Sequence, residues 1–105
     1  MGLNISLETN GEAIRIVVEG EVDLYTSPKL RSAIMESVPA SSSRVEVDLG
    51  AVDYMDSSGV ATLVEGFKSS REHQKSFALV SPSLSVMKVL ELAKLDSVFE
   101  IQKDS

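Results

Sequence analysis

The sequence predicts an α/β fold in which helices pack on a mixed, mostly parallel β-sheet that begins with a β-hairpin. Two observations predict this fold. Segments in which apolar and polar residues alternate are interspersed with segments whose apolar residues recur at helical spacing. In order these segments read ββαβαβαβ, which favours right-handed crossovers between parallel strands. Because 105 residues leave no room for a second core, residues 1–105 are expected to form a single domain.

The first two strands are predicted from apolar residues at positions 3, 5 and 7 and again at 14, 16 and 18. Between them lies Asn10-Gly11, the preferred pair for a tight type I′ turn because both central positions of that turn require positive φ. A hairpin closed by a type I′ turn is therefore expected at the start of the chain.

The first helix is expected to begin at Pro28, with Ser27 as its cap. Proline suits the first helical position because its φ is fixed and it has no N–H to satisfy. Apolar residues follow at positions 30, 33, 34 and 38, and Pro39 with the serines at 41–43 is expected to end the helix. The next strand, with one buried face, is predicted over residues 44–49.

The remaining elements follow the same logic. A second helix has apolar residues at positions 60, 63, 64 and 67 and ends in the polar run 68–75. Residues 77–80 suit a buried strand, and Ser81-Pro82-Ser83 provides the break and cap for a third helix with its inner face at 86, 89, 90 and 93. Residues 98–101 are expected to form a short closing strand.

The loop expected over residues 52–59 carries the candidate site. Ser57 and Ser58 lie where the second helix should begin, and a helix start favours an anionic group by roughly 0.3–1 kcal/mol. A phosphoserine there would fit the fold and would add a charge of about −1.5 to −2 beside Asp56. The alternative is that these three residues serve only as helix caps, for which Ser and Asp are common.

Four segments, in order and spread over nearly the whole chain, resemble the STAS family of bacterial anti-sigma factor antagonists, the sporulation type included. Residues 54–60, Tyr-Met-Asp-Ser-Ser-Gly-Val, resemble its phosphorylation motif, and residues 20–26 resemble its loop before the first helix. Residues 45–49 and 81–86 are similar to its central strand and to the start of its third helix. Residues 71–75 depart from the Gly-rich turn of many relatives, which leaves the shape of that loop open.

The resemblance implies that Ser57 accepts phosphate and that Ser58 is a capping or helical neighbour. It places Asp23 near the motif, where it contributes to partner contact or to the geometry of the kinase reaction; the alternative is an acid that hydrogen-bonds its own loop. Tyr25 and Tyr54 are expected to border the docking surface or to be semi-buried packing residues. The expected partner-binding residues are Asp23, Tyr25, Thr26, Asp56, Ser57, Ser58 and Gly59.

A partner-switching function follows from the resemblance. The unphosphorylated chain is expected to bind an anti-sigma factor that is also a GHKL-type serine kinase, and so to release a sigma factor. Phosphate on Ser57 would end that binding, and a phosphoserine phosphatase would remove it. Three alternatives stay open: an interaction subunit of another partner-switching or stress complex, a subunit of a lipid-trafficking ABC transporter, and an antagonist in a partner-switching circuit whose output is not a sigma factor, for instance motility, secretion or chemosensory control.

The composition argues against other classes of function. With no cysteine, no Gly-x-Ser-x-Gly elbow and His73 alone in a polar run, neither an enzyme nor a metal centre is expected, and no cofactor. The formal charge of −6 has the wrong sign for attraction to nucleic acid or anionic lipid. Apolar runs fall far short of the roughly 18 residues that a membrane span needs. We therefore expect a cytoplasmic protein, and a monomer because no apolar surface stripe is evident.

Overall fold

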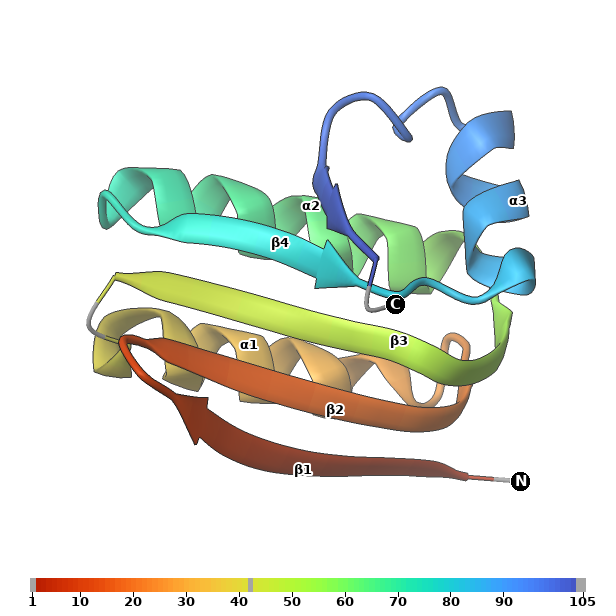
Figure 1. The fold of residues 1–105 in the computed structure, drawn as a ribbon. Helices are drawn as coiled ribbons and strands as arrows, with labels where there is room; N and C mark the ends of the chain where they lie inside the picture. The colour runs from red at the N-terminus through yellow and green to blue at the C-terminus, as the bar shows by residue number, and fades with distance from the viewer. Residues whose placement is uncertain (1, 42, 104–105) are drawn as a thin grey trace.

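The computed structural model describes residues 2–41 and 43–103, which form one five-stranded sheet and three helices (Figure 1). The elements in chain order are β1 (Leu3–Asn10), β2 (Ala13–Val22), α1 (Ser27–Ala40), β3 (Arg44–Met55), α2 (Ser57–Glu72), β4 (Ser76–Val80), α3 (Leu84–Leu92) and β5 (Glu100–Gln102). The predicted order of elements is confirmed.

The sheet has the strand order β1-β2-β3-β4-β5. Its first pair is antiparallel and the other three pairs are parallel, as the sequence predicted. Each parallel crossover moves one strand along in the same direction, so right-handed connections place the helices on one face of the sheet. Figure 1 shows α1 and α2 behind the sheet and α3 beside the end where β3 finishes.

The core lies between the sheet and the helices that cover it. Alternate residues of the strands point toward the helices. Several of the residues between them, among them Glu46, Ala78 and Val80, are also buried. None of the three helices formed by the described residues has the length and apolar character needed to cross a bilayer. The largest fully buried side chains include Ile16, Leu30, Ile34, Leu49, Leu63, Leu79 and Leu90.

The hairpin is confirmed, but its predicted turn type is wrong. Asn10 pairs with Ala13, so the two turn residues are Gly11 and Glu12. Gly11 has φ +64°, whereas Glu12 is not among the residues with positive φ. A two-residue turn with glycine first and positive φ only there corresponds to type II′, so the turn is shifted by one residue from the Asn-Gly pair.

Strand β3 is longer than predicted. It was expected to end at Leu49, yet it continues to Met55 and turns the first half of the expected loop into strand. The cause is the parallel ladder with β2, which continues through two register shifts until Val22 pairs with Met55. The carboxyl ends of β2 and β3 therefore finish side by side, a placement that determines the candidate site.

The limits of α1 also differ from the prediction. The N-cap is Thr26, not Ser27, because the Ser27 N–H already donates to Asp23 O at 2.8 Å and the turn runs directly into the helix. At the other end Pro39 lies inside the helix, since the Ser41 N–H still donates to Ser37 O at 2.9 Å beyond it. Ser42, expected to belong to the terminating loop, lies outside the described residues.

The third helix and last strand are shorter than predicted. Ser83 caps α3 as expected, and its side chain accepts a hydrogen bond from the Val86 N–H at 3.2 Å. Ala93 was expected on the inner face, but it is the exposed C-cap residue because the helix ends at Leu92. Strand β5 begins only at Glu100, after the buried Phe99, and Val98 is exposed.

The turn after α2 takes its shape without glycine. Gln74 has φ +60°, in the left-handed region that favours glycine. The Gln74 N–H donates to Arg71 O and the Lys75 N–H to Ser70 O, at 3.0 and 2.8 Å. These two hydrogen bonds form a Schellman motif at the end of α2. Residues 71–75 therefore end the helix in a standard way although they lack the Gly-rich turn of many relatives.

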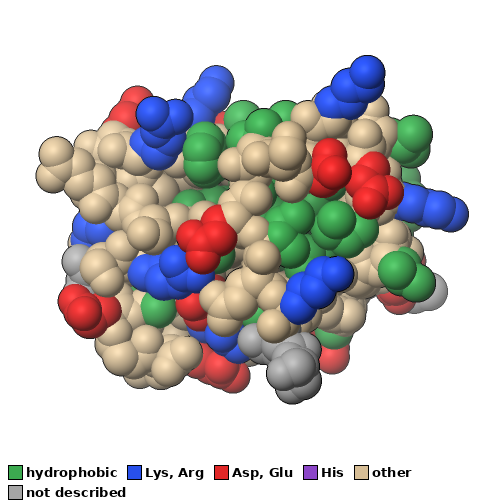
Figure 2. Space-filling view, turned by 45° about the horizontal axis from the view of Figure 1, so that its top comes forward, with side chains coloured by type: hydrophobic (Ala, Val, Ile, Leu, Met, Phe, Trp, Pro, Cys, Tyr) green, Lys and Arg blue, Asp and Glu red, His purple; other side chains and the backbone are tan. Residues whose placement is uncertain are grey.

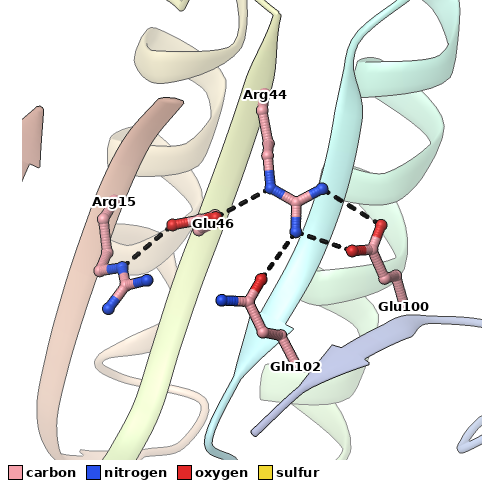
Figure 3. A network of polar contacts seen from close by, with 5 residues as sticks. All are labelled: Arg15, Arg44, Glu46, Glu100 and Gln102. Carbon is pink, nitrogen blue, oxygen red and sulfur yellow. Dashed lines mark hydrogen bonds and ion pairs between the residues drawn. The ribbon is translucent and has the colours of Figure 1, made fainter. Parts of the chain in front are cut away.

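A chain of charged side chains crosses the sheet from β2 to β5 (Figure 3). The two carboxylate oxygens of Glu46 accept hydrogen bonds from Arg15 Nε at 3.0 Å and from Arg44 Nε at 2.8 Å. Arg44 then donates through both terminal nitrogens to Glu100, at 3.2 and 2.7 Å, and to Gln102 Oε1 at 2.9 Å. The network ties the three-residue strand β5 to the middle of the sheet.

Glu46 is 4% exposed. Burial raises the pKa of its carboxyl, but the hydrogen bonds from Arg44 and Arg15 outweigh burial and hold the pKa of Glu46 below its usual value. The pKa of Arg44 is raised, first by its hydrogen bonds to Glu100 and then by those to Glu46. Both partners of the buried pair are therefore ionised at neutral pH.

Candidate functional site

The candidate site lies where β2 and β3 end. Asp23 follows β2 and Asp56 follows β3, and the Asp56 N–H donates to Val22 O at 3.1 Å. In sheets of this kind the carboxyl ends of parallel strands are the usual place for binding sites. The structure thus brings together the two predicted site segments, which are about 30 residues apart in the sequence.

The start of α2 is capped by Asp56. Its Oδ1 accepts a hydrogen bond from the Ser58 N–H at 2.9 Å, and its carbonyl accepts from Gly59 and Val60 at 3.1 and 3.2 Å. The capping interpretation is therefore confirmed for Asp56. Ser57 and Ser58 occupy the first turn of the helix, where unpaired N–H groups favour an anion.

The two serines differ in accessibility. Ser57 is exposed, and its hydroxyl has no hydrogen-bond partner among residues 2–41 and 43–103. Ser58 is partly buried, and its carbonyl accepts a hydrogen bond from Thr62 Oγ1 at 2.9 Å. The Ser57 hydroxyl is therefore accessible to a protein that approaches this end of the sheet.

Gly59 lies beneath the site and is buried. A Cβ at this position would lie 2.6 Å from Met55 Cγ and 2.8 Å from Val22 Cγ1, closer than real contacts allow. The helix can therefore start this close to the strand ends only because residue 59 has no side chain. Gly59 therefore sets the position of the helix start. A direct contact of Gly59 with a partner stays a prediction.

Asp23 folds its carboxylate back onto its own loop. Oδ1 accepts hydrogen bonds from the N–H groups of Tyr25 and Thr26, both at 2.9 Å. Thr26 Oγ1 in turn donates to Glu21 O and accepts from the Asp23 N–H, also at 2.9 Å. The hydrogen bond from the Thr26 N–H is the main reason that the pKa of Asp23 is lowered. The interpretation of Asp23 as an acid bonded to its own loop is confirmed, and its contact with a partner remains a prediction.

Large apolar side chains project from the same region. Tyr25 is 88% exposed and Leu24 67% exposed, while Tyr54, paired with Glu21 in the β2–β3 ladder, is 49% exposed. Semi-buried packing is thus excluded for Tyr25. Leu24 was not among the predicted site residues. The sequence indicated its exposure only through an apolar Leu-Tyr pair in the loop between β2 and α1.

The charge of the site is uniformly acidic. Residues 19–26 contain three acidic residues and residues 51–60 two, and neither segment contains Lys, Arg or His. Such a surface attracts a basic partner and disfavours an acidic one. A phosphate on Ser57 would add negative charge to a region that is already negative.

Exposed apolar surface is not confined to the site. Figure 2 shows a face on which hydrophobic side chains gather, with acidic and basic side chains around them. On α3 both Leu84 and Leu92 are largely exposed, and a shallow hollow of about 370 Å³ lies along this helix, lined by Leu84, Ser85, Met87, Lys88 and Glu91. The monomer expectation rested on the absence of apolar surface, so it loses part of its support and stays a prediction.

Comparison with known proteins identifies the family. The model of the STAS domain matches residues 4–105. The chain belongs to the STAS domain family. A curated relative from Listeria monocytogenes, named anti-sigma-B factor antagonist, is 34% identical over 103 residues, which cover 95% of this chain and 90% of the relative. The predicted resemblance to this family is confirmed.

Solved structures of STAS proteins share the fold. An anti-sigma factor antagonist from Mycobacterium paratuberculosis has a TM-score of 0.87 at 25% identity, covering 96% of this chain and 86% of that one. The anti-sigma factor antagonist SpoIIAA in its unphosphorylated form has a TM-score of 0.81 at 21% identity, covering 97% and 89%. The predicted STAS fold is therefore confirmed.

Proposed function

We propose that this protein is an anti-sigma factor antagonist regulated by phosphorylation of Ser57. In its unphosphorylated form it binds an anti-sigma factor that is also a GHKL-type serine kinase, and the sigma factor is released. The family of the chain and the name of its Listeria relative support this function. The phosphoswitch is supported by the resemblance of residues 54–60 to the family's phosphorylation motif.

The observation that carries the proposal is the placement of Ser57. Its hydroxyl is exposed at the start of α2, beside the capping carboxylate of Asp56 and at the end of the sheet that also carries Asp23. A kinase active site can reach it without unfolding any element. The added phosphate then repels or sterically excludes a partner that docks on this acidic surface, while the helix start tolerates it.

The chain itself acts as the substrate of the switch and not as its enzyme. ATP binds to the kinase, the Ser57 hydroxyl accepts the γ-phosphoryl group, and a phosphoserine phosphatase hydrolyses the ester to restore binding. The acidic surface fits a protein partner and not the backbone of a nucleic acid. Such a circuit operates in the cytoplasm, where the sigma factor and ATP are found.

Binding measurements on three variants test the proposal. Purified GHKL-type kinases from the organism that encodes this chain are titrated with wild type, Ser57→Ala, Ser57→Asp and Ser6→Asp, the last at an exposed serine of β1. Ser57→Ala and the matched control Ser6→Asp should bind as wild type does, whereas the added charge of Ser57→Asp should weaken binding at least tenfold. Equal affinity of Ser57→Asp and wild type would argue against the switch.

A further inference from the structure

The loop between β2 and α1 presents two large side chains to solvent. Leu24 and Tyr25, which we call the loop anchor, are 67% and 88% exposed beside the candidate site. Burying two such side chains against a partner is strongly favourable, and tyrosine is enriched among residues that dominate binding energy. Nothing in the fold needs them, since neither belongs to the buried core.

The backbone of the loop anchor is fixed before any partner arrives. Asp23 Oδ1 holds the Tyr25 and Thr26 N–H groups, and Thr26 Oγ1 is bonded to Glu21 O. The loop then runs directly into α1 through the bond from the Ser27 N–H to Asp23 O. A pre-ordered loop loses little conformational entropy on binding, so more of the contact energy appears as affinity.

The surroundings of the loop anchor determine which partner it fits. Residues 19–26, which include it, and residues 51–60, which end at the start of α2, contain five acidic residues and no basic one. Lys29, in the first turn of α1, donates through Nζ to Leu3 O at 2.8 Å. An apolar projection with an acidic rim is complementary to an apolar pocket edged by Lys or Arg. The site of phosphorylation, Ser57, follows the strand that is paired with β2, so one partner can cover both features.

From these observations we infer that Leu24 and Tyr25 insert into an apolar, basic-rimmed pocket of the anti-sigma kinase and supply most of the affinity. This inference rests on the proposed function and adds a division of roles to it. The loop anchor supplies the binding affinity, and the phosphorylation state of Ser57 determines whether the partner remains bound. Asp23 is then a positioning residue, which acts by holding the loop and not by its own charge.

The test compares exposed apolar residues in a titration of the purified kinase by calorimetry. Tyr25→Ala should raise Kd about 30-fold or more and Leu24→Ala about tenfold. The matched control is Leu7→Ala. Leu7 is an exposed residue of β1 that pairs with Ile16, and Ile16 lies roughly 20 Å along β2 from Val22, where the loop anchor's strand ends. Leu7→Ala should change Kd less than threefold. All three variants should melt as wild type does, because these side chains lie outside the core.

Two further measurements distinguish the binding role of Tyr25 from the positioning role of Asp23. With the kinase and ATP, Tyr25→Ala should raise KM for the protein substrate and leave kcat unchanged, as expected for binding that is equal in ground and transition states. Asp23→Ala should weaken binding, and Asp23→Asn should restore it, because an amide oxygen can accept the same two N–H bonds as Asp23 Oδ1. Failure of Asp23→Asn to restore binding would overturn the positioning role.

The outcomes distinguish this inference from the proposed function. If Ser57→Asp weakens binding but Tyr25→Ala and Leu24→Ala bind as wild type does, the loop anchor is overturned and the switch stands. If wild type binds none of the kinases, the proposed function and the loop anchor fail together. If Tyr25→Ala, Leu24→Ala and Ser57→Asp all weaken binding while Leu7→Ala binds as wild type does, both the loop anchor and the proposed function are supported.

Discussion

Glu46 provides a strong test of how the sheet is held together. It is 4% exposed and accepts hydrogen bonds from two arginines whose side chains are 16% and 24% exposed. Glu46→Gln keeps the shape, removes the charge and turns one acceptor oxygen into a donor that faces a guanidinium group. Hydrogen bonds to charged groups contribute about 1.5–3 kcal/mol and neutral ones about 0.5–1.5. We therefore expect a loss of about 2 kcal/mol, or about 8 °C in Tm.

The pH dependence of this loss is the more specific result. Because the pKa of Glu46 is lowered in the folded state, its contribution is present above the unfolded value of about 4.3 and is lost as pH falls through the folded value. The stability difference between wild type and Glu46→Gln should be complete at pH 7. It should shrink as pH falls below the unfolded value, because the unfolded wild-type chain takes up its proton there while folded Glu46 is still ionised.

The assay is urea unfolding followed by circular dichroism between pH 7 and pH 3, with Glu36→Gln as the matched control. Glu36 is an exposed residue of α1, so its substitution should change the free energy of unfolding by less than about 0.5 kcal/mol. Equal stability of Glu46→Gln and Glu36→Gln at pH 7, or a stability difference that does not decrease in acid, would show that ionised Glu46 does not stabilise the sheet.

Substitutions at three further positions test individual parts of the fold by urea unfolding. Leu63→Ala, in the buried face of α2, should lose about 2–5 kcal/mol, and a smaller loss would mean that this face is loosely packed. Asp56→Ala should lose about 0.5–2 kcal/mol with the cap of α2, and Asp56→Asn should retain most of it; equal losses would contradict the capping role. Gln74→Gly should gain about 0.5–1 kcal/mol by relieving the positive φ, and a loss would mean that Gln74 is not strained.

The spacing of apolar residues predicted the elements well because it reports which face of a strand or helix is buried. Residues 14, 16 and 18 alternate along β2, and positions 60 and 63 of α2 face the core as expected. The ends of elements were less predictable. β3 continues to Met55 because β2 offers it hydrogen-bond partners, and the register shifts in that ladder interrupt the simple alternation.

The candidate site was predictable in part. A cap at Asp56 and an accessible Ser57 follow from local sequence, since both depend on where one helix begins. The closeness of Asp23 and Asp56 depends on the pairing of two strands far apart in the chain, so only the family resemblance indicated it. Leu24 could not be predicted, because an apolar residue in a loop gives no periodic signal of its exposure.

We propose that Ser57 is the residue whose phosphorylation by a kinase prevents this protein from binding its partner. The most direct measurement is to incubate the protein with ATP and each GHKL-type kinase of its own organism, and to map phosphate by mass spectrometry. We expect phosphate on Ser57 in wild type and none on the Ser57→Ala variant. Phosphate on another residue, or no phosphate from kinases that are active on a second substrate, would contradict this proposal.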